Sequence, residues 1–190
     1  MARSYTLKRR AEQQADTRQR IIEAAVDLHG TIGPARTSLS MVAERAKVQR
    51  NTLYAHFPDE LSLAMACSGL AFERDPPPAA AQWRAIGDRS ERLRQALTEI
   101  YGWYAKGAQL LGCVLRDAEH HASTREVSEL RFGPVVADWH KVLGEGLSPA
   151  QQSLIHLSLS FYTWRALVEE AGMAPEAAVA TMARAIESVA

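Results

Sequence analysis

Helix start and stop signals recur along this chain, and no stretch alternates apolar and polar residues as a β-strand would. Alanine, the strongest helix former, occurs 32 times in 190 residues. The clearest interruption is Asp75-Pro76-Pro77-Pro78, because consecutive prolines cannot continue a helix. The sequence therefore predicts an all-α fold of about nine helices without an internal repeat.

Capping residues, glycines and prolines place these helices at about 16–29, 38–46, 50–57, 59–74, 88–106, 109–118, 123–143, 149–171 and 175–189. The strongest start signal is Ser148-Pro149 with Gln151, which combines an N-cap serine, a proline at N1 and a capping glutamine. We expect four segments in chain order. They are a flexible basic arm (1–15), a helix-turn-helix DNA-binding domain (16–57), a connecting helix (58–75), and a ligand-binding and dimerisation domain (76–190).

The formal net charge is zero, but the charges are unevenly distributed. Residues 1–57 contain ten Lys or Arg and five Asp or Glu, whereas residues 58–190 contain twelve and seventeen. A basic head on an acidic body is typical of a DNA-binding module joined to a partner or ligand module. Chance variation is the alternative explanation of the charge pattern alone.

Several classes of protein are disfavoured. No apolar run approaches the roughly 18–20 residues of a membrane span, and the polar N-terminus does not resemble a secretory signal. Two cysteines exclude a disulfide scaffold and favour the cytoplasm. The adjacent pair His120-His121 diverges by about 100° on a helix, so we expect no metal site. No nucleophilic triad or phosphate loop is present, so neither an enzyme nor a cofactor is predicted.

Two short helices, about 38–46 and 50–57, are separated by residues 47–49, which is the spacing of a helix-turn-helix. Val48 is expected to fix the turn in the core, and Leu53 to anchor the second helix from behind. The opposite face of that helix can then reach base edges in the major groove, or phosphates. Base contacts are predicted for Gln49, Arg50, Asn51 and Thr52, and phosphate contacts for Tyr54 and His56.

Residues 17–57, TRQRIIEAAVDLHGTIGPARTSLSMVAERAKVQRNTLYAHF, resemble the N-terminal domain of the tetracycline-repressor-like (TetR) family of transcriptional regulators. The best-matched stretches are Thr17–Leu28, Val42–Val48 and Asn51–Phe57. The resemblance implies that Thr37 and Ser38 contact phosphate at the start of the second helix. It implies the same DNA roles for residues 49–52, 54 and 56, and a C-terminal cavity for a small inducer.

Three residues depart from the family pattern. Lys47 stands where the family usually has glycine, so a left-handed backbone there would cost about 1 kcal/mol. Alternatively, the charge of Lys47 faces DNA, and we include it among the predicted DNA-binding residues. Glu60 stands where a phosphate-binding lysine is common. His29 replaces a usual aromatic residue, and packing is its favoured role.

Residues 79–190 are dense in aromatic side chains, which either fill a core or line an apolar ligand cavity. Helical phase groups them into three faces that could wall such a cavity. The predicted ligand-binding residues are Leu97, Ile100, Tyr101, Tyr104, Leu111, Val114, Leu115, Phe132, Val136, Trp139, Phe161 and Trp164.

The expected helix 149–171 is apolar on both sides, and the alanine-rich helix 175–189 permits close packing, so the two predict a four-helix interface between two chains. Burial within one chain is the alternative. The predicted interface residues are Ile155, Leu159, Tyr162, Ala166, Ala178, Met182, Ala185, Ile186 and Val189.

Together these features predict a homodimeric, ligand-responsive, DNA-binding transcriptional regulator of the cytoplasm, without a membrane partner. We expect a repressor that binds a near-palindromic operator in double-stranded DNA and leaves it when a small, largely apolar effector binds. Two alternatives stay open: a DNA-binding activator or architectural protein without an inducer, and a helical-bundle enzyme.

Overall fold

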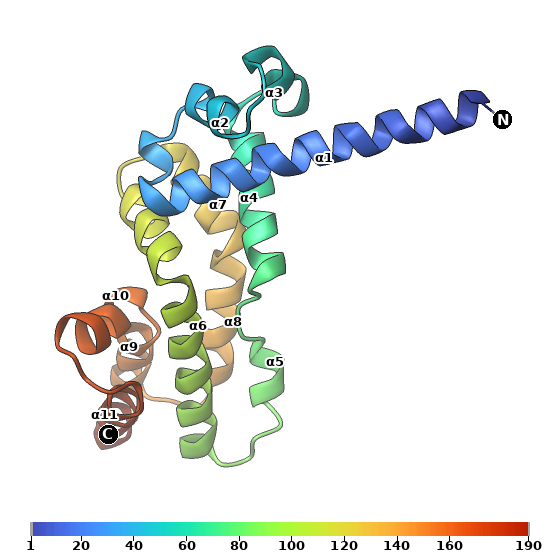
Figure 1. Ribbon diagram of the computed structural model, residues 1–190. Helices are drawn as coiled ribbons and strands as arrows, with labels where there is room; N and C mark the ends of the chain where they lie inside the picture. Colours follow the sequence, from blue (N-terminus) through green and yellow to red (C-terminus); the bar gives the residue numbers. More distant parts are fainter. Residues whose placement is uncertain (1, 190) are drawn as a thin grey trace. The chain divides into compact units, whose positions relative to one another are not determined.

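A computed structural model describes the backbone of residues 2–189 and the side chains of residues 8–189. This part of the chain contains eleven α-helices, one 3-10 turn and one π-helical turn, and no strand (Figure 1). The predicted all-α class is therefore confirmed, with two helices more than expected. None of the described helices is long and apolar enough to cross a membrane.

The chain divides into two compact units, each built from two stretches of sequence. The N-terminal unit consists of residues 1–74 and 112–128, and the C-terminal unit of residues 75–111 and 129–190. This division differs from the expected one, because the helix after the predicted DNA-binding domain belongs to the N-terminal unit, and so do residues 112–128.

The N-terminal unit is organised around a helix-turn-helix. Its elements are α1 (Ala2–Thr31), η1 (Pro34–Arg36), α2 (Leu39–Arg45), α3 (Arg50–His56) and α4 (Glu60–Arg74), with the end of α6 (Arg89–Ala118) and the start of α7 (Ala122–Arg131). Helix α1 packs against α2 and α4 (Figure 1). The core between them is aliphatic apart from Phe57 and Cys67, and includes the fully buried Ile21, Ala25 and Leu53.

The expected arm, residues 1–15, is helical over its described backbone, since α1 extends back to Ala2. Residues 2–15 contain neither glycine nor proline, and the strong helix formers Ala, Glu, Gln and Arg make up their second half. Nothing in this stretch interrupts the hydrogen bonding of the helix that follows. The side chains of Lys8, Arg9 and Arg10 are exposed along α1.

The C-terminal unit contains α5 (Ala80–Trp83), the start of α6, α8 (Gly133–Leu143), α9 (Pro149–Ser158), α10 (Phe161–Trp164), the π-helical turn η2 (Arg165–Glu170) and α11 (Pro175–Ser188). Helix α5 packs on α8, and α9 contacts α8, α10 and α11. The predicted start of α9 is confirmed in detail, because Ser148 and Gln151 form a reciprocal capping box with Pro149 at the first helical position.

Three predicted helix boundaries are wrong, each for a local reason. Helix α6 runs through Gly107, because glycine weakens a helix but keeps the N–H that its hydrogen bonds need. The expected helix 123–143 is broken at Phe132, since Pro134 starts the new helix α8. The expected helix 149–171 ends at Ser158, and Ser160 caps α10 by accepting a hydrogen bond from the Tyr162 N–H at 3.2 Å.

Two tyrosines of α6 bind the backbone where α9 ends. Tyr101 donates its hydroxyl to the Ser158 carbonyl at 3.0 Å, and Tyr104 donates to the Leu159 carbonyl at 2.6 Å. Helix ends leave carbonyl groups without helical partners, and a buried unpaired carbonyl is costly. The two hydroxyls therefore supply hydrogen-bond donors to the carbonyl groups between α9 and α10. Both tyrosines lie in the core, and burial raises the pKa of each hydroxyl.

The proline segment before α5 is held by indole groups. Trp103 donates its Nε1–H to the Asp75 carbonyl at 3.0 Å, and Trp139 donates to the Pro78 carbonyl at 2.8 Å. Pro76, Pro77 and Pro78 have no backbone N–H, so they cannot pair by an ordinary helical pattern. Tryptophan donors from two different helices thus fix the path of a segment without regular structure.

We predict that Tyr104→Phe lowers the free energy of unfolding by about 1–3 kcal/mol, because the buried Leu159 carbonyl loses its donor. Chemical denaturation followed by circular dichroism measures this. Tyr54→Phe is the matched control, since the exposed Tyr54 hydroxyl accepts only a long hydrogen bond of 3.4 Å from Arg50. Equal stability of the two variants would contradict the role assigned to Tyr104.

Candidate nucleic-acid interface

The helix-turn-helix begins with a capped helix. Ser38 has an extended backbone, and its hydroxyl oxygen accepts a hydrogen bond from the Met41 N–H at 3.3 Å. The neighbouring Thr37 donates its hydroxyl to the Gly33 carbonyl at 2.8 Å. Ser38 is exposed and Thr37 is half-buried. The two predicted phosphate-binding residues therefore lie side by side in sequence at the start of α2, with the Ser38 hydroxyl proton still available to a ligand.

The turn between α2 and α3 is fixed from three sides. The Lys47 N–H donates to the Glu44 carbonyl at 3.0 Å, and the Val48 N–H to the Ala43 carbonyl at 2.9 Å. Val48 packs against the core of the N-terminal unit. Lys47 adopts φ 55°, which makes it the one non-glycine residue with positive φ among the described residues. The left-handed backbone that the sequence suggested at Lys47 is present.

Helix α3 divides cleanly into a buried and an exposed side. Leu53 and the following Phe57 have 0% and 1% of their surface exposed, so they anchor the helix in the core. Gln49, whose side chain makes no capping hydrogen bond, precedes the helix and is exposed. The predicted DNA-binding residues on or beside α3 are exposed at Lys47, Gln49, Arg50, Asn51 and Tyr54, and half-buried at Thr52 and His56.

Arg50 is oriented by its own helix. Its Nη2 donates to the Tyr54 hydroxyl at 3.4 Å, and its guanidinium carbon lies 5.9 Å from the centre of the Tyr54 ring. Residues four apart share a helix face, so this pair follows from sequence spacing. By contrast, the nearby Arg45 forms an ion pair with Asp27. Lys47 and Arg50 have no acidic partner among the described residues, which leaves their charge available to an anion.

Sequence reasoning missed the role of Asp117, which comes from residues 112–128 of the N-terminal unit. Its carboxylate is 1% exposed and accepts hydrogen bonds from the Ala35 N–H at 2.9 Å and from Arg116 Nε at 2.8 Å. Burial opposes its charge, but these bonds and the Arg116 charge prevail and lower the pKa of Asp117. No local pattern signals a contact between positions 82 residues apart.

Glycine is required where this carboxylate meets the loop before α2. Gly33 has φ 95°, and a Cβ atom there would lie 2.3 Å from Asp117 Oδ2. The absence of a side chain therefore permits the close approach that the Ala35–Asp117 hydrogen bond needs. The loop is followed by Thr37 and Ser38, so Asp117 helps to position the start of α2.

Comparison with known proteins agrees with this geometry. The family described as bacterial regulatory proteins, tetR family, matches residues 21–66. Over these residues the chain is therefore similar to TetR-family regulators. The match spans the last third of α1, the helix-turn-helix and the first half of α4.

A curated relative, the HTH-type transcriptional repressor KstR of Mycolicibacterium smegmatis, is 36% identical over 64 residues. That alignment covers 34% of this chain and 31% of KstR, so the chain spans about a third of its curated relative.

Solved structures of TetR-type regulators share the fold over most of the chain. The transcriptional regulator FadR from Bacillus subtilis, in complex with stearoyl-CoA, has a TM-score of 0.62 at 16% identity, covering 90% of this chain and 97% of FadR. A TetR-like transcriptional regulator from Rhodococcus sp. RHA1 has a TM-score of 0.59 at 22% identity, covering 90% and 93%. At these identities the likeness extends the TetR fold beyond residues 21–66, but not the function.

The predicted ligand-binding residues of the C-terminal unit gather around Tyr104. Its ring centre lies within 6.4 Å of the ring centres of Tyr101, Trp139, Phe161 and Trp164. These five side chains are buried, as are Leu97 and Ile100. The other predicted ligand-binding residues are half-buried: Leu111, Phe132 and Val136 in the C-terminal unit, and Val114 and Leu115 in the N-terminal unit. The ring contacts fit a packed aromatic core, and ligand binding here stays a prediction.

The residues predicted for the dimer interface differ in exposure within a single chain. Five of them are at most 7% exposed, so their own chain already covers most of their surface: Ile155, Leu159, Ala178, Met182 and Ile186. On α9 the large apolar side chain that stays exposed is Leu157, at 49%. Of the remaining predicted residues, Tyr162 and Ala166 are exposed, and Ala185 and Val189 are half-buried.

We predict that Lys47→Gly raises the free energy of unfolding by up to about 1 kcal/mol, because glycine adopts positive φ without a steric penalty. Thermal or chemical denaturation checks this. Lys47→Ala removes the same charge but keeps the left-handed strain, so it should not be stabilising. If glycine is no more stabilising than alanine, backbone strain at Lys47 is negligible.

We predict a loss of stability in mild acid that depends on His29. Burial lowers the pKa of His29 to about 4, although the Asp117 charge opposes this. Below its ordinary pKa of about 6.5 the unfolded chain binds a proton that the folded chain does not. The free energy of unfolding should therefore fall from pH 6.5 to 4, by up to about 3 kcal/mol.

His29→Phe should reduce this pH dependence, measured by urea denaturation at each pH. Some dependence should persist, because burial also lowers the pKa of His140. A slope that is identical in His29→Phe and the unaltered chain would show that His29 is protonated as readily when folded.

Proposed function

We propose that this chain is a sequence-specific DNA-binding transcriptional regulator and acts as a repressor. The observation that carries the proposal is the solvent-facing side of α3. There Gln49, Arg50 and Asn51 stand exposed on a short helix whose other side is anchored by Leu53 and Phe57. Arg and Asn are among the residues that pair with guanine and adenine edges in the major groove.

The surrounding residues suit phosphate contacts, which position a protein on DNA without reading sequence. We assign this role to Thr37, Ser38, Tyr54 and His56, and add the unpaired charge of Lys47. The relative KstR is named a transcriptional repressor, which supports repression as the direction of regulation.

The chain acts on DNA as a homodimer in this proposal. Leu157 and Tyr162 leave 49% and 42% of their surfaces exposed on α9 and α10, and large exposed apolar side chains favour association. Two recognition helices related by a two-fold axis read a near-palindrome whose half-site centres lie about 34–36 Å apart. We place the interface on the exposed sides of α9, α10 and α11.

An effector is the remaining part of the proposal. FadR was solved with stearoyl-CoA bound, which supports a small-molecule ligand for a chain of this fold. We propose that a largely apolar effector enters between the aromatic side chains around Tyr104 and lowers affinity for the operator. Coupling between two sites is reciprocal, so operator DNA then lowers affinity for the effector by the same factor. The chain has no catalytic role in this account, and it functions in the cytoplasm.

The proposal is tested by selecting bound sequences from random duplex DNA. We expect enrichment of one near-palindrome, bound with an affinity that falls steeply as salt rises. A helical-bundle enzyme would enrich no sequence. An architectural protein would bind without a palindrome, and an activator would raise transcription from a reporter that carries the selected site.

We predict that Arg50→Ala weakens binding to the selected operator by about 1–3 kcal/mol and relaxes the preference at one base pair. The matched variant Tyr54→Phe removes a hydroxyl assigned to phosphate, so it should weaken all duplexes alike. Fluorescence anisotropy with operator and scrambled duplexes measures both. If Arg50→Ala weakens both duplexes equally, Arg50 anchors the protein, and Gln49 or Asn51 reads the base.

A further inference from the structure

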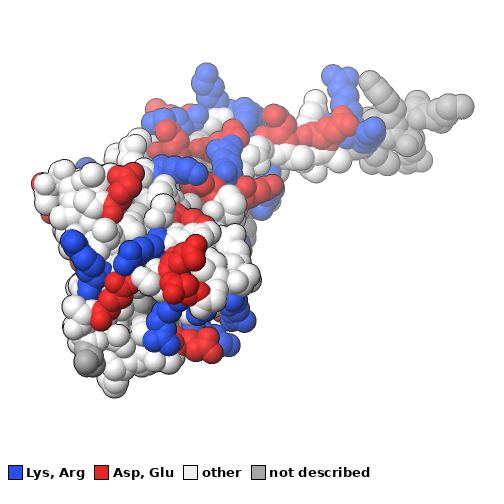
Figure 2. All heavy atoms as spheres, turned by 90° about the horizontal axis from the view of Figure 1, so that it is seen from below, with Lys and Arg blue, Asp and Glu red and all other residues white. Residues whose placement is uncertain are grey.

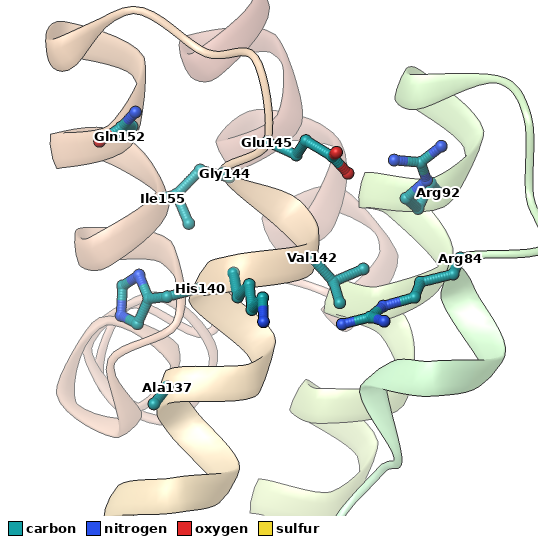
Figure 3. A pocket seen from close by; sticks show the side chains of 10 residues that line it. Arg84, Arg92, Ala137, His140, Val142, Gly144, Glu145, Gln152 and Ile155 are labelled. Atoms are coloured by element: carbon teal, nitrogen blue, oxygen red, sulfur yellow. The ribbon is translucent and has the colours of Figure 1, made fainter.

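A cavity of about 860 Å³ lies in the C-terminal unit, away from the rings clustered around Tyr104. In Figure 3, Arg84 approaches it from the end of α5, which it directly follows, and Arg92 from α6, while His140 and Gln152 come from α8 and α9. Its volume falls within the range of about 300–1,000 Å³ that is usual for small-molecule sites. None of the predicted ligand-binding residues lines it.

Positive charge is concentrated in this cavity. Its lining includes Arg84, Arg92 and Lys141 but one acidic residue, Glu145. Residues 75–111 and 129–190 together contain nine Lys or Arg and eleven Asp or Glu, so the unit as a whole is acidic. Figure 2 shows basic and acidic side chains intermixed on the face in view. The cavity lining thus has three basic residues and one acidic residue, whereas the unit as a whole has more acidic than basic residues.

The cationic groups are free to bind a ligand. Arg92 donates from Nε and Nη2 to the Ile86 carbonyl at 3.0 and 2.8 Å, which orients its guanidinium and leaves three of its five N–H groups. Arg84 and Lys141 form no ion pair among the described residues. Two arginines elsewhere in the unit do form ion pairs, Arg94 with Glu187 and Arg165 with Glu170.

The rest of the lining is apolar or uncharged. Val142 and Ile155 are buried side chains that form part of the wall, and Ala137 lies beside them. Burial and the nearby His156 lower the pKa of His140, so its imidazole is neutral near pH 7. The cavity therefore offers two arginines and a lysine next to an apolar wall.

We propose that this cavity binds a small organic oxyanion, a carboxylate or phosphate joined to a short apolar group, through Arg84, Arg92 and Lys141. Guanidinium groups bind such oxyanions by paired, charge-assisted hydrogen bonds. Ala137, which is exposed in the lining, contacts the apolar group. The proposal concerns the C-terminal unit alone, so it stands independently of DNA binding.

The test is isothermal titration calorimetry of the full chain with two probes, hexanoate and inorganic pyrophosphate. We expect saturable binding of at least one probe in the millimolar range or tighter, weakened by added salt. Tighter binding of hexanoate identifies a carboxylate ligand, and tighter binding of pyrophosphate identifies a phosphate ligand.

Two variants assign binding to the cavity. The pair Arg84→Gln and Lys141→Gln, both at exposed positions, should together weaken the preferred probe by about tenfold or more. Ala137→Trp fills the cavity without removing charge and should also weaken binding. Arg94→Gln removes an arginine that does not line the cavity and should change affinity by less than about twofold.

The proposal is overturned if neither probe binds, or if both cavity variants bind like the unaltered chain. Circular dichroism verifies that each variant is folded. The Arg84→Gln and Lys141→Gln pair removes charge, whereas Ala137→Trp removes space. If one of these variants fails to fold, the other still tests the proposal.

Discussion

The C-terminal unit depends on hydrogen bonds that two tyrosine hydroxyls donate to backbone carbonyls at the end of α9. Tyr101 and Tyr104, one turn apart on α6, donate to the consecutive carbonyls of Ser158 and Leu159 where α9 stops. Because those carbonyls are satisfied, the chain can turn at Ser160 and bring Phe161 and Trp164 back against the Tyr104 ring. The same aromatic cluster includes Trp139, whose indole holds the proline segment at Pro78. Three hydrogen bonds inside an apolar core thus set the path of several segments.

The N-terminal unit holds α3 rigidly in its core and leaves the side chains on the outer face of α3 exposed to solvent. Anchoring comes from Leu53 and Phe57, and from the turn hydrogen bonds around Lys47. The exposed residues of α3 make few contacts with their own chain, so the DNA binding proposed above requires few existing contacts to be broken. The strained backbone at Lys47 is tolerated because the residues on either side of it are held in place.

Short-range signals predicted the features that depend on neighbours in sequence. Ser38, the turn at residues 47–49, the buried Leu53 and the capping box at Ser148 all follow from spacing of four residues or fewer. Contacts between residues far apart in the sequence could not be predicted from such local patterns. Those contacts determine the remaining features of the fold and of the cavity. The break at Ser158 depends on tyrosines more than fifty residues earlier, and the phase of α9 depends on which side of it the rest of the unit covers. The cationic cavity likewise joins side chains from α6, α8 and α9 with Arg84, which follows α5.

The position of Asp117 in the sequence limits how the N-terminal unit can be transferred to another protein by recombination or by protein engineering. The acceptor for the Ala35 N–H is supplied from near the end of α6, so the N-terminal unit is not encoded by a continuous stretch of sequence. A chimera that joins residues 1–74 to the C-terminal part of another protein would place an unrelated residue opposite Gly33. The close approach there needs a carboxylate on one side and glycine, which has no Cβ atom, on the other. Recombination therefore preserves the structure of the N-terminal unit only if the segment around Asp117 is transferred with residues 1–74.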